Sequence, residues 1–236
     1  MKARHAPERV VAIVPVKSLA AAKTRLSGTL AAVERRRLML WMAERVVRSL
    51  RTSGCIAHIA VITPDPYVLS WAQEQGATPL RQPHEGLNRG LALARAWAVE
   101  RRAEALLVAL GDLPTLAAHE VRALLAYGLE AAGERAVVLA PDRDERGTNL
   151  LLMRPPTLLP FSFGAESFAR HTAISRSIVG EPLVFHAPGS AFDVDTPDDL
   201  VELEARGLWR RGLSPQWAPP APSEALAPTM EEAAHG

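Results

Sequence analysis

Residues 10–26 read VVAIVPVKSLAAAKTRL, an apolar run that leads directly into a segment with three cations. The β-branched run at 10–16 predicts a buried first strand. Anionic ligands of α/β sheets bind outside the carboxyl ends of strands, so Lys17, Lys23 and Arg25 are well placed to bind a polyphosphate. The same residues would also suit a solvated basic loop, and the choice depends on the rest of the chain.

The composition indicates a globular chain with an aliphatic core, because 48% of its 236 residues are hydrophobic and only 5% are aromatic. Its 27 Lys and Arg against 26 Asp and Glu argue against a nucleic-acid partner. The single cysteine, Cys55, excludes an internal disulfide. No apolar run approaches the ~18 residues of a membrane span, and residues 1–9 lack a signal-peptide core. We therefore expect a cytoplasmic protein with no membrane partner.

Strand-like and helix-like segments alternate along the chain. Apolar runs predict strands at 10–16, 56–63, 105–111, 135–140, 148–153 and 182–187, and helical spacing predicts helices at 34–51, 66–75 and 87–102. Such alternation is typical of βαβ units. We expect one α/β domain over residues 1–212, with a Rossmann-like, mostly parallel mixed sheet flanked by helices. The Pro- and Ala-rich segment 213–236 lacks periodicity, which predicts a disordered tail.

A lone carboxylate follows the predicted strand at 105–111. In the sequence Gly111-Asp112-Leu113-Pro114, the proline ends the strand and the glycine allows a ligand to approach the backbone. A charge at the mouth of an apolar strand requires compensation. Mg²⁺ bridging Asp112 to a phosphate would supply it. The alternative is that Asp112 only caps the following helix.

Several carboxylates lie close together at residues 193–199. The sequence Thr196-Pro-Asp-Asp199 predicts a helix start with a capping box, which accounts for the last two carboxylates without any chemistry. Asp193 and Asp195 precede this cap and face the same way if the backbone is extended. Asp193 is the better second metal ligand, whereas Asp195 either joins it or only shapes the turn.

Two further segments have the properties of small-ligand sites. Gly164-x-x-Ser167 lies at a predicted helix start, where backbone N–H groups and a hydroxyl would bind an anion. His171 follows it, and we expect it to pack or orient neighbours rather than act as a base. Asn88 carries both a donor and an acceptor, as needed to read a purine edge or a ribose, although it would equally serve as a helix cap.

Six segments, taken in order, resemble the 2-phospho-L-lactate / phosphoenolpyruvate guanylyltransferases of deazaflavin coenzyme (F-420) biosynthesis. The resemblance extends over roughly residues 8–205. It implies a nucleotidyltransferase whose fold is similar to that of nucleotide-diphospho-sugar transferases. The segments are Val14–Lys17 with Ala22–Leu26, Gly86–Asn88, Gly111–Pro114, Asp142–Asn149, Phe163–His171 and Phe192–Leu200.

The resemblance also implies roles for particular residues. Lys17, Lys23 and Arg25 would hold the triphosphate of GTP and take part in catalysis, with Asn88 and Gly111 also near the nucleotide. Asp112 and Asp193 would hold Mg²⁺, and Asp195 is a further candidate ligand. Asp112 would also be a catalytic residue. Thr148, Gly164 and Ser167 would hold phosphoenolpyruvate or 2-phospho-L-lactate.

We expect a phosphate oxygen of the acid to attack the α-phosphorus of GTP and release pyrophosphate. A general base is unnecessary, because the second pKa of a phosphate monoester is about 6. Three alternatives stay open: a glycosyltransferase using Asp193-Val-Asp195 as its metal motif, a nucleotidyltransferase acting on molybdopterin or a sugar phosphate, and a non-catalytic nucleotide-binding module. The enzyme would be a monomer or a homodimer.

Overall fold

The computed structural model describes residues 9–131 and 134–210, so the tail predicted at 213–236 lies outside the described residues. The strands are β1 (Val10–Pro15), β2 (His58–Thr63), β3 (Thr78–Arg81), β4 (Ala105–Ala109), β5 (Ala136–Pro141), β6 (Thr148–Arg154) and β7 (Leu183–Val184). The helices are α1 (Ala32–Thr52), α2 (Pro66–Glu74), α3 (Leu87–Glu100), α4 (Ala118–Ala131), α5 (Ser167–Ile178) and α6 (Pro197–Ala205). Two 3-10 turns, η1 (Leu19–Ala21) and η2 (Thr24–Leu26), follow β1.

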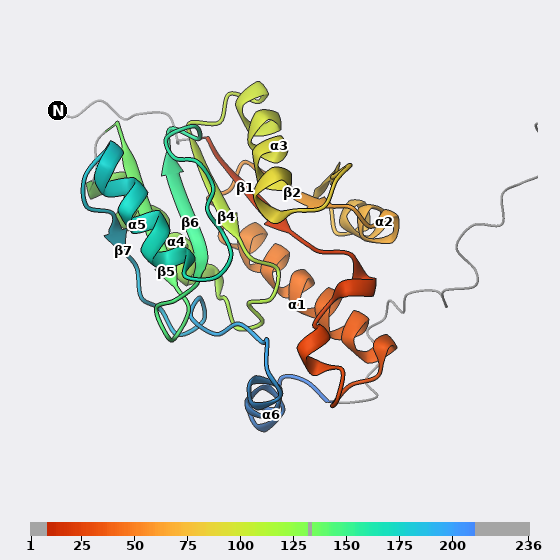
Figure 1. Cartoon of the computed structure of the whole chain (residues 1–236). Helices are drawn as coiled ribbons and strands as arrows, with labels where there is room; N and C mark the ends of the chain where they lie inside the picture. Colours follow the sequence, from red (N-terminus) through yellow and green to blue (C-terminus); the bar gives the residue numbers. More distant parts are fainter. Residues whose placement is uncertain (1–8, 132–133, 211–236) are drawn as a thin grey trace, which may run out of the picture.

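The strands form one sheet in the order β3-β2-β1-β4-β6-β5-β7 (Figure 1). Strands β1 to β4 are parallel where they pair, whereas β6 runs antiparallel to both β4 and β5. This arrangement confirms the predicted mostly parallel mixed sheet. Because β6 is reversed, its first residues lie at the edge where the parallel strands end. Thr148 at the start of β6 and Asp112 after β4 therefore belong to the same edge.

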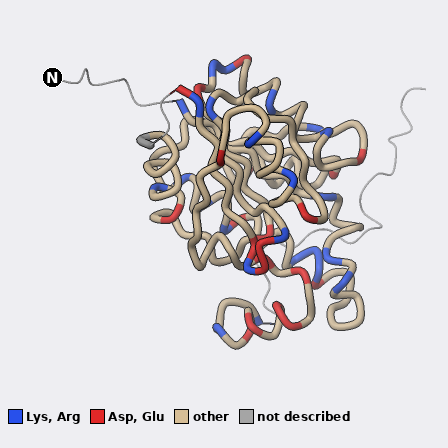
Figure 2. The backbone as a smooth tube through the Cα atoms, turned by 60° about the vertical axis from the view of Figure 1, so that its left-hand side comes forward, with Lys and Arg blue, Asp and Glu red and all other residues tan. Residues whose placement is uncertain are grey.

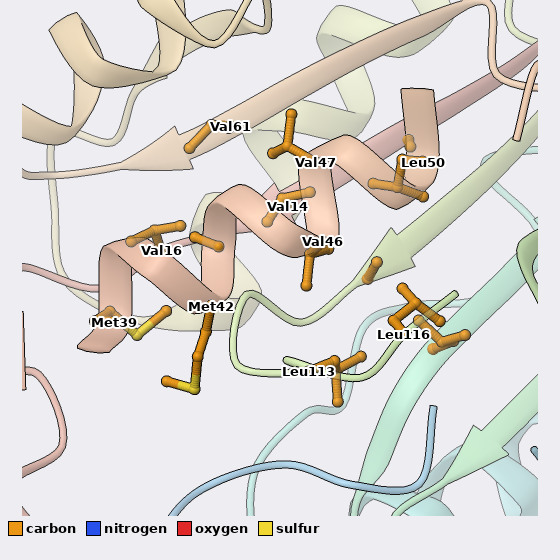
Figure 3. Close-up of a cluster of buried hydrophobic side chains, with 14 of the residues drawn as sticks. Val14, Val16, Met39, Met42, Val46, Val47, Leu50, Val61, Leu113 and Leu116 are labelled. Atoms are coloured by element: carbon orange, nitrogen blue, oxygen red, sulfur yellow. The ribbon is translucent and has the colours of Figure 1, made fainter. Parts of the chain in front are cut away.

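The core lies on both faces of the sheet, as the apolar first strand predicts. Alternate residues of β1 point to opposite faces: Val10, Ala12 and Val14 join one buried cluster, and Val11 and Ile13 join the other. Helices α1, α2, α4 and α6 contribute to the first cluster, and α3 and α5 contribute to the second. Figure 3 shows side chains of α1 among those of β1, β2 and the segment after β4 in the first cluster.

Local sequence signals explain several element boundaries. Asp65 caps α2, where its carboxylate accepts a hydrogen bond from the Tyr67 N–H at 3.0 Å, and Pro66 follows. Thr196 and Asp199 form the predicted capping box of α6. Strand β3 and helix α4 were not predicted, and β7 is shorter than the predicted strand at 182–187. None of the described helices is both long and apolar enough to cross a membrane.

Candidate functional site

Charged residues gather at the carboxyl edge of the parallel strands, where segments from distant parts of the sequence meet. The cation segment follows β1, Asp112 follows β4, and the backbone N–H of Val194 donates to the Asp112 carbonyl at 3.3 Å. Figure 2 shows acidic and basic stretches next to one another at the lower end of the molecule, while the middle of the tube carries little charge. The fold thus brings the two predicted acidic segments together with the predicted cations.

Lys23 is at the centre of this charged cluster. Its Nζ donates to Asp112 Oδ2 at 2.6 Å and to Asp195 Oδ1 at 2.7 Å, and only 6% of its side chain is exposed. Arg25 lies farther out, with Nη1 3.7 Å from Asp195 Oδ2. Lys17 is exposed, yet its positive charge lowers the pKa of Asp195. We call Lys17, Lys23, Arg25, Asp112, Asp193 and Asp195 the charged cluster.

The electrostatics of the charged cluster are strongly coupled. Burial alone would lower the pKa of Lys23, but the carboxylates of Asp112 and Asp195 outweigh it and raise that pKa. Burial would likewise raise the pKa of Asp195, but Lys23, Arg25 and Lys17 lower it. Asp193 behaves differently, because burial and the carboxylates of Asp112 and Asp195 raise its pKa to about 6. Among the described residues no ion pair joins Asp193 to a cation, in contrast to Asp112 and Asp195.

The donor set of the charged cluster fits a hard divalent cation. Its three acidic side chains offer only oxygen ligands, as Mg²⁺ prefers, and Asp112 Oδ1 is buried without a hydrogen-bond partner. Across residues 9–131 and 134–210, however, no three His, Cys, Asp or Glu side chains surround a ready-made ion position. The Lys23 ammonium instead bonds to two of the three carboxylates. In this conformation the ammonium compensates the charge that a metal ion would otherwise neutralise.

A second, mostly uncharged cluster lies where β6 begins and α5 starts. Thr148 and Ser167 are almost fully buried, and the Thr148 N–H donates to Ser167 Oγ at 2.9 Å. The Thr148 hydroxyl lies 3.0 Å from His171 Nδ1, and the backbone N–H of Ser162 donates to His171 Nε2 at 3.0 Å. We call Thr148, Ser162, Gly164, Ser167 and His171 the hydroxyl pocket, a name for this set of contacting residues rather than for an open cavity. Its members include all three residues that the resemblance assigns to the phosphorylated acid.

The loop that carries Gly164 is held from two sides. The Asn88 side chain donates to the Phe163 carbonyl at 3.1 Å and accepts from the Phe163 N–H at 2.8 Å. Arg170 Nη2 donates to the Ser162 carbonyl at 3.1 Å. Gly164 itself has a φ of +123°, which residues with a side chain rarely adopt. Asn88 thus anchors this loop, and its contact with a nucleoside stays a prediction.

Gly111 provides close backbone approach rather than open space. A Cβ at this position would lie 3.2 Å from both the Pro15 carbonyl oxygen and Met39 Cε. The glycine therefore lets the loop after β4 pack against the end of β1. Its predicted contact with the nucleotide is not decided by this packing and stays a prediction.

Two positioning residues, Asp65 and Asn149, were missed in the sequence, whereas the third, His171, packs and orients its neighbours as predicted. Asp65 accepts a hydrogen bond from the Leu19 N–H at 2.9 Å, so the residue that caps α2 also holds the cation segment. Asn149 is buried and donates to the Ser190 carbonyl at 3.0 Å and to Asp193 Oδ1 at 3.3 Å. His171 links the elements of the hydroxyl pocket. Their sequence signals, an Asp-Pro helix start and polar residues beside an apolar strand, do not reveal partners this far away.

A cavity of about 640 Å³ lies at the opposite edge of the sheet. It is lined by residues that precede β4 and β5 and that end or follow β6: Ala103, Glu104, Glu134, Arg135, Arg154, Pro155, Thr157 and Leu158. None of the predicted site residues is among them. The candidate site is therefore the carboxyl edge, with the charged cluster and the hydroxyl pocket.

Comparison with known proteins identifies relatives that match most of this chain. The phosphoenolpyruvate guanylyltransferase of Sphaerobacter thermophilus is 46% identical over 194 residues, which cover 82% of this chain and 91% of that protein. That of Rubrobacter xylanophilus is 46% identical over 201 residues, covering 84% and 95%. Both relatives match nearly their whole length.

Solved structures with low sequence identity share the architecture. A nucleotidyl transferase from Methanothermobacter has a TM-score of 0.62 at 15% identity, over 85% of this chain and 98% of that one. The 4-diphosphocytidyl-2C-methyl-D-erythritol synthase of Anaerococcus prevotii has a TM-score of 0.58 at 10% identity, over 85% and 96%. A family model described as guanylyl transferase CofC like matches residues 10–210. The chain is thus a nucleotidyltransferase that belongs to the CofC-like guanylyl transferase family.

Proposed function

We propose that this enzyme joins GTP to phosphoenolpyruvate or 2-phospho-L-lactate, with release of pyrophosphate, in deazaflavin coenzyme (F-420) biosynthesis. A phosphate oxygen of the acid attacks the α-phosphorus of GTP, and the bond between the α-phosphorus and the β-phosphate bridging oxygen breaks. The observation that carries the proposal is the charged cluster, which lies at the same sheet edge as the hydroxyl pocket. The names of the relatives at 46% identity support the choice of substrates.

Charge compensation is the main task of the site, because both substrates are anions. Lys17, Lys23 and Arg25 bring three positive charges, which the cluster's three carboxylates cancel when ionised. The cluster alone therefore offers little net attraction to a second anion. Asp112, Asp193 and Asp195 would hold Mg²⁺, which supplies positive charge to the reacting phosphates and to the leaving pyrophosphate. The side chains of Lys17, Lys23 and Arg25 would then bind the triphosphate.

The hydroxyl pocket suits the non-reacting end of the acid. Thr148 Oγ1 and Ser167 Oγ each lie within hydrogen-bond distance of a ring or backbone nitrogen. Hydroxyl and backbone N–H donors bind a carboxylate without adding a fixed positive charge. The acid would thus lie with its carboxylate in the hydroxyl pocket and its phosphate at the charged cluster.

Pyrophosphate release tests this proposal directly. GTP, ATP and CTP are each incubated with phosphoenolpyruvate, 2-phospho-L-lactate or 3-phosphoglycerate, with Mg²⁺ or with a chelator. We expect release only with GTP, with one of the first two acids, and with Mg²⁺. Asp198→Asn is a matched control for Asp112→Asn, since Asp198 is exposed on α6. No release with either of the first two acids, together with release in parallel incubations with molybdopterin or a sugar phosphate, would contradict the proposed substrates.

The alternative of a glycosyltransferase gains one structural argument. Asp193 and Asp195 lie near Asp112 in space although they come late in the sequence, since Asp112 raises the pKa of Asp193. A position near the C-terminus therefore does not exclude them as metal ligands. Incubation with GDP-sugars would reveal this activity as free GDP. GTP binding without any product would favour a non-catalytic module.

A further inference from the structure

We propose that His171 is a positioning residue for the phosphorylated acid, because its two ring nitrogens fix the Thr148 hydroxyl and the Ser162–Gly164 loop relative to each other. This inference rests on the proposed function, which assigns the acid to the hydroxyl pocket. His171 is fully buried and so acts through its neighbours. Its ring also packs edge-on against Phe163, with centroids 4.8 Å apart.

The hydrogen-bond partners determine the tautomer of the ring. The backbone N–H of Ser162 can only donate, so His171 Nε2 accepts and carries no proton. Burial, with the charge of Arg170, lowers the pKa of His171 to about 4, and the ring is neutral at physiological pH. The single ring proton must then lie on Nδ1, which donates to Thr148 Oγ1 at 3.0 Å.

This tautomer has a consequence for the hydroxyl groups of the pocket. Thr148 Oγ1 accepts from His171, and Ser167 Oγ accepts from the Thr148 N–H. Each hydroxyl therefore keeps its own proton for another acceptor, as the carboxylate of an acid would require. A neutral ring performs this task without placing a second cation beside Arg170.

The same ring also holds the loop. Ser162 is bound at its N–H by His171 and at its carbonyl by Arg170. Phe163 is bound at both backbone groups by Asn88. The next residue is Gly164, whose left-handed φ keeps the turn tight. Losing the His171 contact would release this turn on the side that faces Thr148.

Two substitutions separate the two hydrogen bonds. His171→Gln keeps an acceptor near the Nε2 position but loses the donor to Thr148, whereas His171→Asn keeps a donor near the Nδ1 position. We expect His171→Gln to raise the KM for the acid about tenfold, as for one hydrogen bond to a charged group, with the KM for GTP within about twofold. His171→Asn should cause a smaller rise. Equal rises in both KM values, or a fall in kcat alone, would overturn the proposal.

A double variant separates positioning from stability. His171→Phe alone and Thr148→Val alone each leave a buried polar group without its partner, so each should lower the urea midpoint. Combining them removes the mismatch between the two side chains, so the double variant should be more stable than the sum of the two losses predicts, although the Ser162 N–H still lacks its acceptor. The acid KM should nevertheless stay raised in the double variant. A double variant with the wild-type acid KM would show that the pair serves only folding.

Two measurements need no turnover and keep the tests distinguishable. Nitrogen-15 NMR of histidine-labelled protein, assigned with His171→Gln, should show the Nδ1–H tautomer, and the Nε2–H tautomer would overturn the inference. Calorimetry with phosphoenolpyruvate should show weaker binding to His171→Gln than to the wild type, and equal binding would also overturn it. An inactive wild type that binds phosphoenolpyruvate in this manner would refute only the proposed reaction.

Discussion

Replacing Lys23 by methionine should destabilise the metal-free protein and make a divalent cation more stabilising. Methionine keeps much of the aliphatic stem but removes the ammonium that bonds to Asp112 and Asp195 at 2.6 and 2.7 Å. Breaking a fully buried ion pair costs about 3–5 kcal/mol, because the remaining charge is left uncompensated. Asp112 and Asp195 are 21% and 44% exposed, so water recovers part of this loss. We expect a net loss of about 2–3 kcal/mol.

The assay is thermal unfolding in a chelator and in Mg²⁺. For a domain of this size each kcal/mol shifts the Tm by about 2–4 °C, so Lys23→Met should melt roughly 4–12 °C lower in the chelator. Arg25→Met is the matched control, since Arg25 is 75% exposed and its contact with Asp195 is 3.7 Å long. Its Tm should change by no more than about 2 °C.

Adding Mg²⁺ then separates the two roles of the carboxylates. In the wild type a divalent ion competes with the Lys23 ammonium for Asp112 and Asp195, whereas the variant has lost that competitor. Mg²⁺ should therefore raise the Tm of Lys23→Met more than that of the wild type, by mass action. An equal rise in the Tm of wild type and Lys23→Met on adding Mg²⁺ would refute this competition. Equal Tm values of Lys23→Met and Arg25→Met in the chelator would refute the role of the buried ion pair.

Three further predictions follow from individual contacts. Asp112→Asn should reduce turnover by about 10²–10³ at a temperature where the variant is folded, and it should also lower the urea midpoint, because Lys23 then keeps only Asp195 as an ionised partner. Activity of the folded variant within about tenfold of wild type would contradict its role. The pKa of His171 is about 4 against an ordinary 6.5, so the unfolded chain binds more protons between these values. The unfolding free energy should thus fall by roughly 2–3 kcal/mol from about pH 7 to pH 4, and urea curves of His171→Gln should lack this component. Asn149→Ala should cost about 1–3 kcal/mol by removing the donor to Ser190 and Asp193, and an unchanged urea midpoint would contradict this.

The architecture could be predicted from the sequence where local signals are strong. The β-branched run at 10–16 became the buried strand β1, and Thr196 and Asp199 formed the predicted capping box. Strand β3 was missed because it is only four residues long, contains Pro79 and is mostly half-buried at the edge of the sheet. Its pattern lacks the continuous apolar character of a central strand.

The components of the site could be predicted, but their pairing could not. The cations and carboxylates of the charged cluster stood out because each lies beside an apolar strand or a helix start. That Lys23 bonds to both Asp112 and Asp195 depends on the strand order, which local patterns do not determine. Asn88 likewise has a plausible local role as a cap, whereas its partner is the backbone of Phe163, 75 residues away.

The ion pair between Lys23 and Asp195 spans 172 residues. During synthesis most of the sheet therefore leaves the ribosome before the last member of the charged cluster does. A chain that stops short of residue 190 would contain all the strands but none of the late carboxylates. Premature termination would thus yield a fragment that has the strands but lacks Asp193 and Asp195. Such a fragment could fold in large part and would still lack a complete charged cluster.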